Sequence, residues 1–366
     1  MAKPAELSDR ELRLHWMGSQ RLLPGTRAKT VAAAAKGALT IQAQDVPAAS
    51  LGVRARTEGL TSDRAAKQAR GASACRSWLM RNTVFLFAAA DLAWMRPLLA
   101  ERPMGPAVRR LGQLGVTDAK RRRVMEALGD RVAAGPLPRA EAIELIESLG
   151  VGRGENNSTV YWVLHAAALE GVLVVGPALD REQVYAAAPA STQIDRVEGL
   201  GRLARRYLDA YGPAGPDDFA YFFKLPKSEA RTAWEGAGRT VEVETSRGTL
   251  TALPATLERP LPDAPAVRLI GPWDHYVLGW SKGRATTVPP GFEREVHPGA
   301  GYLRATALAD GLAVGTWKLE RRRGSATVAV KPFGKLPRGA RPGLEAEAAD
   351  VGRWLGVDAE LRVAPG

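Results

Sequence analysis

The sequence predicts an α+β protein built from winged helix-turn-helix units, and three observations support this fold class. Three helices followed by a pair of strands recur twice along the chain, which is the element order of a winged helix-turn-helix. A region with the glycine-rich turns of β-hairpins then extends from about 267 to 330. Hydrophobic residues make up 45% of the 366 residues, which is enough for the cores of two or three domains.

Capping signals predict the first helices. Ser8 and Glu11 fit a capping box, so a helix is expected to begin next to Ser8. An alanine-rich helix should end near Gly37, because glycine favours a helix C-terminus. Pro47 suits the first turn of a third helix, and Asp45 is expected to cap that helix rather than to act in catalysis.

Two glutamines, Gln42 and Gln44, stand between the second and third of these helices. Thr40 and Ile41 favour an extended backbone there, and in an extended segment side chains two residues apart point to the same side. Two neutral carboxamides would then face one spot. By spacing alone, the polar edge of a short strand is the commoner explanation, so a functional interpretation depends on the rest of the chain.

The segment from about 62 to 95 is predicted to contain two helices with a strand between them. Arg81 lies in the predicted strand, and Asp91 is expected to help start the second helix. The side chain of Arg81 either reaches a phosphate or pairs with an acid, and the sequence favours neither alternative.

The two recurring patterns and a last helix complete the predicted elements. In the first recurrence, helices are expected at 117–131, 138–149 and 158–170, and a strand at 172–175. In the second recurrence, helices are expected at 200–211, 213–223 and 226–234, and a strand at 241–244. The last helix is expected at 342–355.

The net charge of +12, from 51 Lys and Arg against 39 Asp and Glu, favours a polyanionic partner over an acidic small substrate. A merely basic protein is the alternative. The basic residues cluster at 54–81 and at 318–341. Such runs are often solvated faces, but they also suit contacts with phosphates. The candidate DNA-binding residues are Arg54, Arg56, Arg81, Lys318, Arg321, Arg322 and Arg323.

The sequence also predicts what the protein lacks. Cys75 is the single cysteine, which excludes an internal disulfide and a cysteine-based metal cluster. The four histidines have no metal-ligand spacing, and no phosphate loop or dinucleotide fingerprint occurs, so no metal and no cofactor are expected. With no signal peptide or apolar run long enough to cross a bilayer, we expect a cytoplasmic, nucleoid-associated monomer without membrane contact.

Five segments, taken in order, carry a family resemblance. They are TIQAQDVPAASLGVRAR, RSWLMRNTVFLF, GPWDHYVLGW, DGLAVGTWKLERR and LEAEAADVGRWLG. Together, from about residue 10 to 356, they resemble the AlkZ-like family of winged-helix DNA glycosylases. The chain departs from the family pattern at Asn82, Phe85 and Trp273, where Gly, His and Phe are more usual.

The resemblance implies a C-shaped protein of three tandem winged helices around a basic channel for duplex DNA. The implied domains are 1–115 with the glutamine motif, 116–195, and 196–366 with the hairpin region and last helix. The family's catalytic motif of glutamine, hydrophobic residue and glutamine maps onto Gln42, Ala43 and Gln44. Candidate channel-lining residues are Trp273, Asp274 and Tyr276, although a buried Asp most often holds backbone.

The implied activity is that of a monofunctional glycosylase acting on double-stranded DNA. Its substrates would be bulky alkylated purines, with interstrand crosslinks as further candidates, in self-resistance to a DNA-alkylating natural product. Alkylation at purine N7 makes the base cationic, so it can leave without a general acid, and amide dipoles then suffice. The alternative from the residues is a winged-helix transcriptional regulator, but a regulator has no need for Gln42 and Gln44 outside a recognition helix. A non-catalytic protein that shields lesions is a third interpretation.

Overall fold

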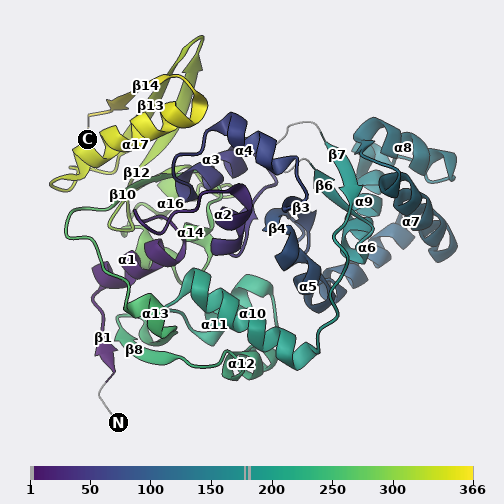
Figure 1. Ribbon diagram of the computed structural model, residues 1–366, viewed down its shortest axis with the longest axis horizontal. Coiled ribbons are helices and arrows are strands. Elements are labelled where there is room, and N and C mark those ends of the chain that lie inside the picture. The colour runs from purple at the N-terminus through teal and green to yellow at the C-terminus, as the bar shows by residue number, and fades with distance from the viewer. Residues whose placement is uncertain (1–3, 177–178, 180–182, 366) are drawn as a thin grey trace. The chain divides into compact units, whose positions relative to one another are not determined.

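A computed structural model of the chain describes residues 4–176, 179 and 183–365 (Figure 1). Its internal contacts form two compact units, one of Met1–Ala65 with Leu200–Gly366 and one of Ala66–Gly199. Both contain helices and strands, which confirms the α+β class. The predicted boundary after residue 195 lies close to the end of the second unit, whereas the one after residue 115 lies inside it. The division into three winged-helix domains stays a prediction.

The predicted caps of the first unit are present. The Glu11 carboxylate accepts a hydrogen bond from the Ser8 backbone N–H at 2.8 Å, and the Ser8 hydroxyl oxygen accepts one from the Glu11 N–H at 3.3 Å. The Asp45 carboxylate accepts from the Ala48 N–H at 2.7 Å, as its predicted capping role requires. Ser8 thus begins α1 (Asp9–Ser19), and Asp45 begins α3 (Val46–Arg56). Helix α2 (Val31–Gly37) lies between them.

The second predicted recurrence of three helices and a strand pair belongs mainly to the first unit. Its elements are α10 (Arg196–Tyr211), α11 (Pro216–Phe223), α12 (Lys227–Glu235), β8 (Val241–Thr245) and β9 (Gly248–Ala252). Strand β8 pairs antiparallel with β9, and the N-terminal strand β1 (Ala5–Glu6) joins parallel to β8. Helix α13 (Pro254–Leu257) follows, and the predicted element order of this segment is confirmed.

The predicted β-rich region forms a five-stranded sheet of order β10-β11-β12-β13-β14. Its first four strands are antiparallel neighbours, whereas β14 pairs parallel with β13 because helix α17 carries the chain back across the sheet. Strand β14 was not expected from the sequence. The strands are β10 (Val267–Ile270), β11 (Thr306–Ala309), β12 (Leu312–Arg322), β13 (Ser325–Pro332) and β14 (Asp358–Val363). The helices are α14 (His275–Leu278), α15 (Arg284–Thr287), α16 (Glu293–Val296) and α17 (Ala340–Leu355).

A buried charge network fastens α17 to the rest of the first unit. The Arg54 guanidinium, 0% exposed, lies 3.1 Å from the Glu347 carboxylate and 2.9 Å from that of Asp350, and it also donates to the Leu269 carbonyl. Glu347 further accepts from the Arg268 guanidinium and from the Leu269 N–H. The prediction that Arg54 contacts DNA is therefore wrong, because its side chain is buried among carboxylates.

The second unit starts with a hairpin where the sequence predicted one strand. Strands β3 (Ala74–Trp78) and β4 (Val84–Ala88) pair antiparallel, and Arg81 lies in the turn between them with a left-handed φ of 57°. The placement of Arg81 inside a strand was wrong, because the polar residues Arg81 and Asn82 form the turn between two apolar strands. Asp91 does lie in the first turn of the following helix. The helices around this hairpin are α4 (Ser62–Ala69), which spans the junction of the units, α5 (Ala89–Leu99) and α6 (Glu101–Gln113).

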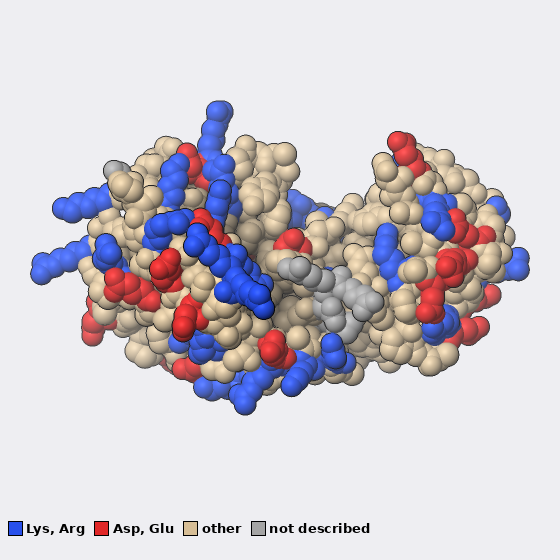
Figure 2. All heavy atoms as spheres, turned by 90° about the horizontal axis from the view of Figure 1, so that it is seen from above, with Lys and Arg blue, Asp and Glu red and all other residues tan. Residues whose placement is uncertain are grey.

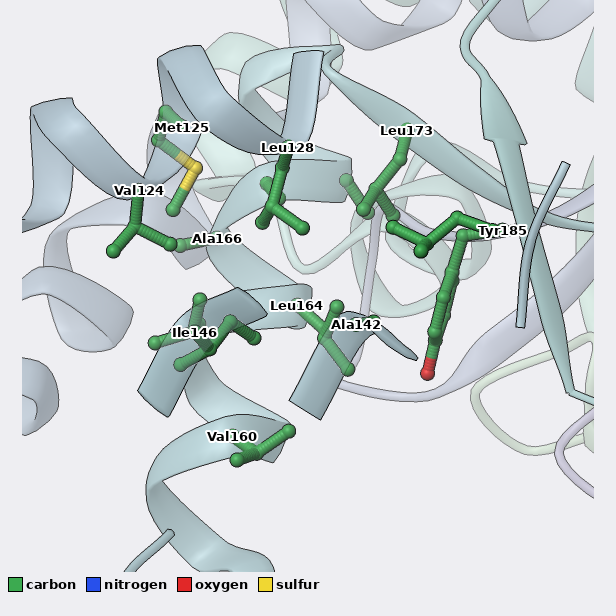
Figure 3. Close-up of a cluster of buried hydrophobic side chains, with 14 of the residues drawn as sticks. Val124, Met125, Leu128, Ala142, Ile146, Val160, Leu164, Ala166, Leu173 and Tyr185 are labelled. Atoms are coloured by element: carbon green, nitrogen blue, oxygen red, sulfur yellow. The ribbon is translucent and has the colours of Figure 1, made fainter. Parts of the chain in front are cut away.

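The remainder of the second unit follows the first predicted recurrence. Its elements are α7 (Asp118–Ala133), β5 (Leu137–Pro138), α8 (Arg139–Ser148), η1 (Glu155–Asn157), α9 (Ser158–Glu170), β6 (Leu173–Gly176) and β7 (Val184–Ala187). Strand β7 pairs antiparallel with both β6 and β5. Figure 3 shows Leu128, Ile146 and Leu164, from the three α-helices, pointing toward one another in the core. Burial of these apolar side chains holds the helices on the strands.

Replacing Glu347 by Ala should lower the free energy of unfolding by about 3 to 5 kcal/mol, because it leaves two buried guanidinium groups without their shared carboxylate. Urea denaturation measures the effect. The matched control is Glu345→Ala on the same helix, whose exposed carboxylate pairs with Arg341, and it should change stability by less than about 0.5 kcal/mol. Similar losses in the two variants would contradict the anchoring role of the network.

Candidate functional site

The glutamine segment connects α2 to α3 in the first unit. Only β2 (Ile41–Gln42) is a strand, and the chain bends at residues 44 and 45 before α3 begins. Ile41 and Ala43 are buried, whereas Gln42 is half-buried and Gln44 is exposed. This alternation places both glutamines on the accessible side of the segment. The Gln42 carboxamide oxygen also accepts a hydrogen bond from the Gln44 backbone N–H at 3.3 Å, which ties the two residues together locally.

A glycine of α3 lets the segment pack closely on that helix. A Cβ atom at Gly52 would lie 2.8 Å from Cγ2 of Ile41, closer than real Cβ contacts come. Any larger residue at this position would therefore push β2 away from α3. The position of Gln42 thus depends on Gly52 in the helix that follows it.

The segment borders a small recess, which lies entirely in the first unit. Three stretches of chain contribute its walls: the glutamine segment, one face of α3, and the loop that leads into α14. The lining residues are Thr40, Ile41, Gln42, Ala48, Gly52, Arg56, Pro272, Trp273, Asp274 and His275. The structure thus brings Gln42 together with Trp273 and Asp274, which the sequence had singled out separately.

Arg56 and Asp274 form a buried ion pair at this recess. The two terminal guanidinium nitrogens of Arg56 each lie 2.7 Å from one Asp274 oxygen, and one of them also donates to the Gln20 side-chain oxygen at 2.9 Å. Asp274 in addition caps α14 by accepting from the Tyr276 N–H at 2.9 Å. Arg56 is 1% exposed, so its predicted contact with DNA is wrong and its partner is a carboxylate of the same unit.

This pairing determines the protonation state of the acid. Burial by itself would raise the pKa of the Asp274 carboxyl, but the Arg56 guanidinium and the hydrogen bonds from Arg56 and Tyr276 outweigh burial and hold that pKa below its ordinary value. The same contact raises the pKa of Arg56. Asp274 therefore remains ionised at neutral pH and cannot donate a proton to a leaving group. The pair adds no net charge to the recess.

The two aromatic candidates behave differently. Trp273 is half-buried and lines the recess, and its indole N–H donates to the Gly301 carbonyl at 2.8 Å. Tyr276 is fully buried, and its hydroxyl donates to the Gly311 carbonyl at 2.9 Å. The prediction that Tyr276 lines a channel is wrong, because the first turn of α14 directs its ring into the core. Asp274 borders the recess, and the expectation that a buried Asp holds backbone is confirmed by its cap.

The remaining basic candidates are at the surface. Lys318, Arg321, Arg322 and Arg323 are all exposed, at the end of β12 and in the turn that joins it to β13. Side chains alternate along a strand, so Lys318 and Arg322 point to one face of the sheet and Arg321 to the other. Figure 2 shows Lys and Arg projecting at the left of the view, over the part of the first unit where Figure 1 places β13, β14 and α17. Arg81 is half-buried in the second unit.

Sequence reasoning missed two residues of this region. Thr40 is fully buried at the recess, and its hydroxyl has no hydrogen-bonding partner among the described protein atoms. Tyr302 packs edge to face on Trp273 and remains exposed. The position of Thr40 two residues before Gln42 was the available signal for the first. Nothing local in the sequence pointed to Tyr302.

No group of three or more His, Cys, Asp or Glu within 4–176, 179 and 183–365 has the arrangement of a metal site. Among the helices of the described part, none is both long enough and apolar enough to cross a membrane.

Comparisons with known proteins agree with one another. The model of a family described as "DNA glycosylase AlkZ-like" matches residues 35–354. The chain is 24% identical over 346 residues to the "Interstrand DNA cross-link repair glycosylase" of Streptomyces sahachiroi, which covers 87% of this chain and 88% of that protein. The solved structure of the Streptomyces sahachiroi DNA glycosylase AlkZ matches with a TM-score of 0.81 and 23% identity, covering 98% of this chain and 100% of the other. At that identity, the structural match shows a shared fold.

Proposed function

This chain belongs to the AlkZ-like DNA glycosylase family and is therefore a DNA glycosylase, and from that premise we propose that it hydrolyses the N-glycosidic bond of bulky alkylated, cationic purines. A relative that bears the name of an interstrand cross-link repair glycosylase adds crosslinked purines as proposed substrates. Resistance to a DNA-alkylating natural product is the proposed biological role. Family membership favours this enzyme over a transcriptional regulator, which the helix pattern by itself also allowed.

One observation carries the choice of a cationic leaving group: the recess beside Gln42 offers neutral groups and an already neutralised acid. The Asp274 carboxylate has both oxygens bound by Arg56, so it is neither a proton donor nor an available base. The Asp45 carboxylate caps α3. An unmodified purine needs protonation to leave, whereas a purine alkylated at N7 already carries the positive charge. A site of carboxamides and hydroxyls therefore suits the alkylated base.

In the proposed reaction, the bond between the sugar C1′ and the purine N9 breaks, and its electron pair passes to the purine. This neutralises the charge that alkylation placed on the ring. The sugar passes through an oxocarbenium-like state, a water oxygen bonds to C1′, and the water loses a proton to solvent, which leaves an abasic site. The carboxamide dipoles of Gln42 and Gln44 orient the water and stabilise the developing charge.

We propose a winged-helix architecture for holding DNA. Support comes from the order helix, strand, helix, helix, strand pair at 118–187 and from three helices and a strand pair at 196–252. A third such unit at the N-terminus and a C-shaped arrangement around a basic channel remain part of the proposal, as does a monomer bound to the nucleoid. The exposed basic end of the β12–β13 hairpin is the proposed phosphate-contacting element of the first unit.

Replacing Gln44 by Ala, and to a lesser degree Gln42 by Ala, should slow single-turnover excision by one to three orders of magnitude. This corresponds to about 1.4 to 4 kcal/mol of lost transition-state stabilisation. The substrate is a duplex with one N7-methylguanine, and hot alkali converts each abasic site to a strand break. Unchanged excision in both variants would rule out the catalytic assignment.

Gln113→Ala is the control for this experiment. Gln113 is an exposed glutamine on α6 whose side chain accepts from Arg110, so its truncation tests the effect of losing a surface carboxamide elsewhere. The control variant should excise at the wild-type rate. Affinity for the lesion duplex should stay unchanged in all three variants, because the proposed role of the glutamines lies in the transition state.

Replacing Arg321, Arg322 and Arg323 together by Ala should weaken binding to every duplex alike. Each phosphate contact that is lost should reduce the slope of log affinity against log salt concentration by about 0.9. Affinities for several unrelated undamaged duplexes across a salt series measure both effects.

The matched control replaces the same three residues by Lys, which keeps the charge of the hairpin and should retain most of the salt slope. An unchanged slope in the Ala variant would show that the hairpin lies in solvent away from DNA. A single strongly preferred undamaged sequence would contradict the proposed nonspecific contact, because phosphates carry no base identity.

A further inference from the structure

Trp273, which is half-buried, and Tyr302, which is exposed, form an aromatic pair at the edge of the recess. Their ring centroids lie 4.9 Å apart with an interplanar angle of 83°, an edge-to-face contact. Trp273 lines the recess with Gln42. Tyr302 is 42% exposed, and it and Val197 are the large hydrophobic residues exposed within the described part of the chain. The first unit therefore presents an apolar ring beside the candidate catalytic segment.

The backbone holds this pair in a costly conformation. Trp273 has a φ of 54°, which is unusual for a bulky residue, and the turn before Tyr302 has left-handed φ values at Gly299, Ala300 and Gly301. The Trp273 backbone N–H donates to the Leu303 carbonyl at 3.3 Å, and its indole N–H donates to the Gly301 carbonyl. Strain of this kind persists where the surroundings enforce it and is concentrated at binding and active sites.

We propose that Trp273 and Tyr302 bind a planar aromatic substituent carried by the alkylated purine, an inference that rests on the proposed function. The recess is far smaller than the roughly 300 to 1,000 Å³ of sites that enclose drug-sized ligands. A bulky substituent thus remains outside the recess while the glycosidic bond meets the glutamines. The exposed ring of Tyr302, packed on the half-buried Trp273, provides the stacking surface for a flat, apolar group.

Three lesions in one duplex sequence test this binding site: N7-methylguanine, N7-benzylguanine and N7-(cyclohexylmethyl)guanine. The last has a saturated ring of similar size and separates stacking from simple apolar contact. Tyr302→Ala should raise the apparent Kd for the benzyl lesion about tenfold, with the maximal single-turnover rate retained. Tyr302→Phe should behave as wild type. Because Tyr302 is largely at the surface, its truncation leaves the core intact.

Val197→Ala is the control, since it truncates the other exposed hydrophobic residue, and it should leave all three values of Kd unchanged. Equal effects of Tyr302→Ala on the three lesions would overturn the inference, because they would indicate contact with the DNA itself. Equal effects on the benzyl and cyclohexylmethyl lesions would also overturn it, since no aromatic preference would remain. No excision of any lesion by the wild-type protein would instead overturn the proposed function and this inference with it.

A second, independent observation concerns Thr40. Thr40 lines the recess, and its buried hydroxyl has no protein partner among the described residues, which costs stability. Such groups are retained where they bind water or act in function. We infer that Thr40 is a positioning residue, which holds the attacking water together with the carboxamide of Gln42. This inference also rests on the proposed function.

Thr40→Val keeps the shape of the side chain and removes the hydroxyl. It should slow single-turnover excision of N7-methylguanine about tenfold, while the urea midpoint stays the same or rises. Thr40→Ser should restore the rate. A wild-type rate in the Val variant would overturn the inference, and so would a lowered urea midpoint that accounts for the loss of activity. Lack of excision by the wild-type protein would instead show that the proposed function itself is wrong.

Discussion

The ion pair between Arg56 and Asp274 is the interaction on which the candidate site depends. It joins the end of α3 to the loop before α14, two positions 218 residues apart in the chain. Charges buried this deeply are tolerated only when they are paired with good geometry, and here each of the two terminal guanidinium nitrogens faces one carboxylate oxygen. The pair therefore sets the distance between the two walls of the recess. The Gln20 side chain, bound to the same guanidinium, extends this anchor to the end of α1.

The same pair explains the chemistry available at the site. Of the charged side chains that line the recess, Arg56 and Asp274 neutralise each other, so the recess mainly presents the Gln42 carboxamide and the Trp273 indole ring. Such groups stabilise charge through fixed dipoles, but they transfer no proton at neutral pH. This favours a substrate whose leaving group is already activated. In the proposed reaction, the charge comes from the alkylated base, and the protein positions the reacting groups.

The positive charge of the chain serves two different purposes. Arg54 and Arg56 lie inside the first unit as partners of buried carboxylates, and there they stabilise the fold. Lys318 and the three arginines at the end of β12 are exposed, where side chains remain hydrated and can meet phosphates. The number of basic residues in the sequence does not distinguish the buried arginines from the exposed ones. Burial in the folded protein shows which of them stabilise the fold and which are candidates for contact with DNA.

Local sequence determined much of this protein. The Ser8–Glu11 box, the Asp45 cap and the two successions of helices and strands follow from interactions between residues close in the chain, and the structure has them. The alternation of Ile41, Gln42, Ala43 and Gln44 likewise follows from the geometry of extended backbone.

Tertiary structure decided the rest. The partners of Arg54 and Arg56 lie more than 200 residues away, so no local pattern shows that their guanidinium groups are buried. Strand β14 needed α17 to bring it beside β13. The recess forms because three segments that are distant in the chain pack together. Local sequence patterns do not reveal such contacts, because they report only on residues that are close in the chain.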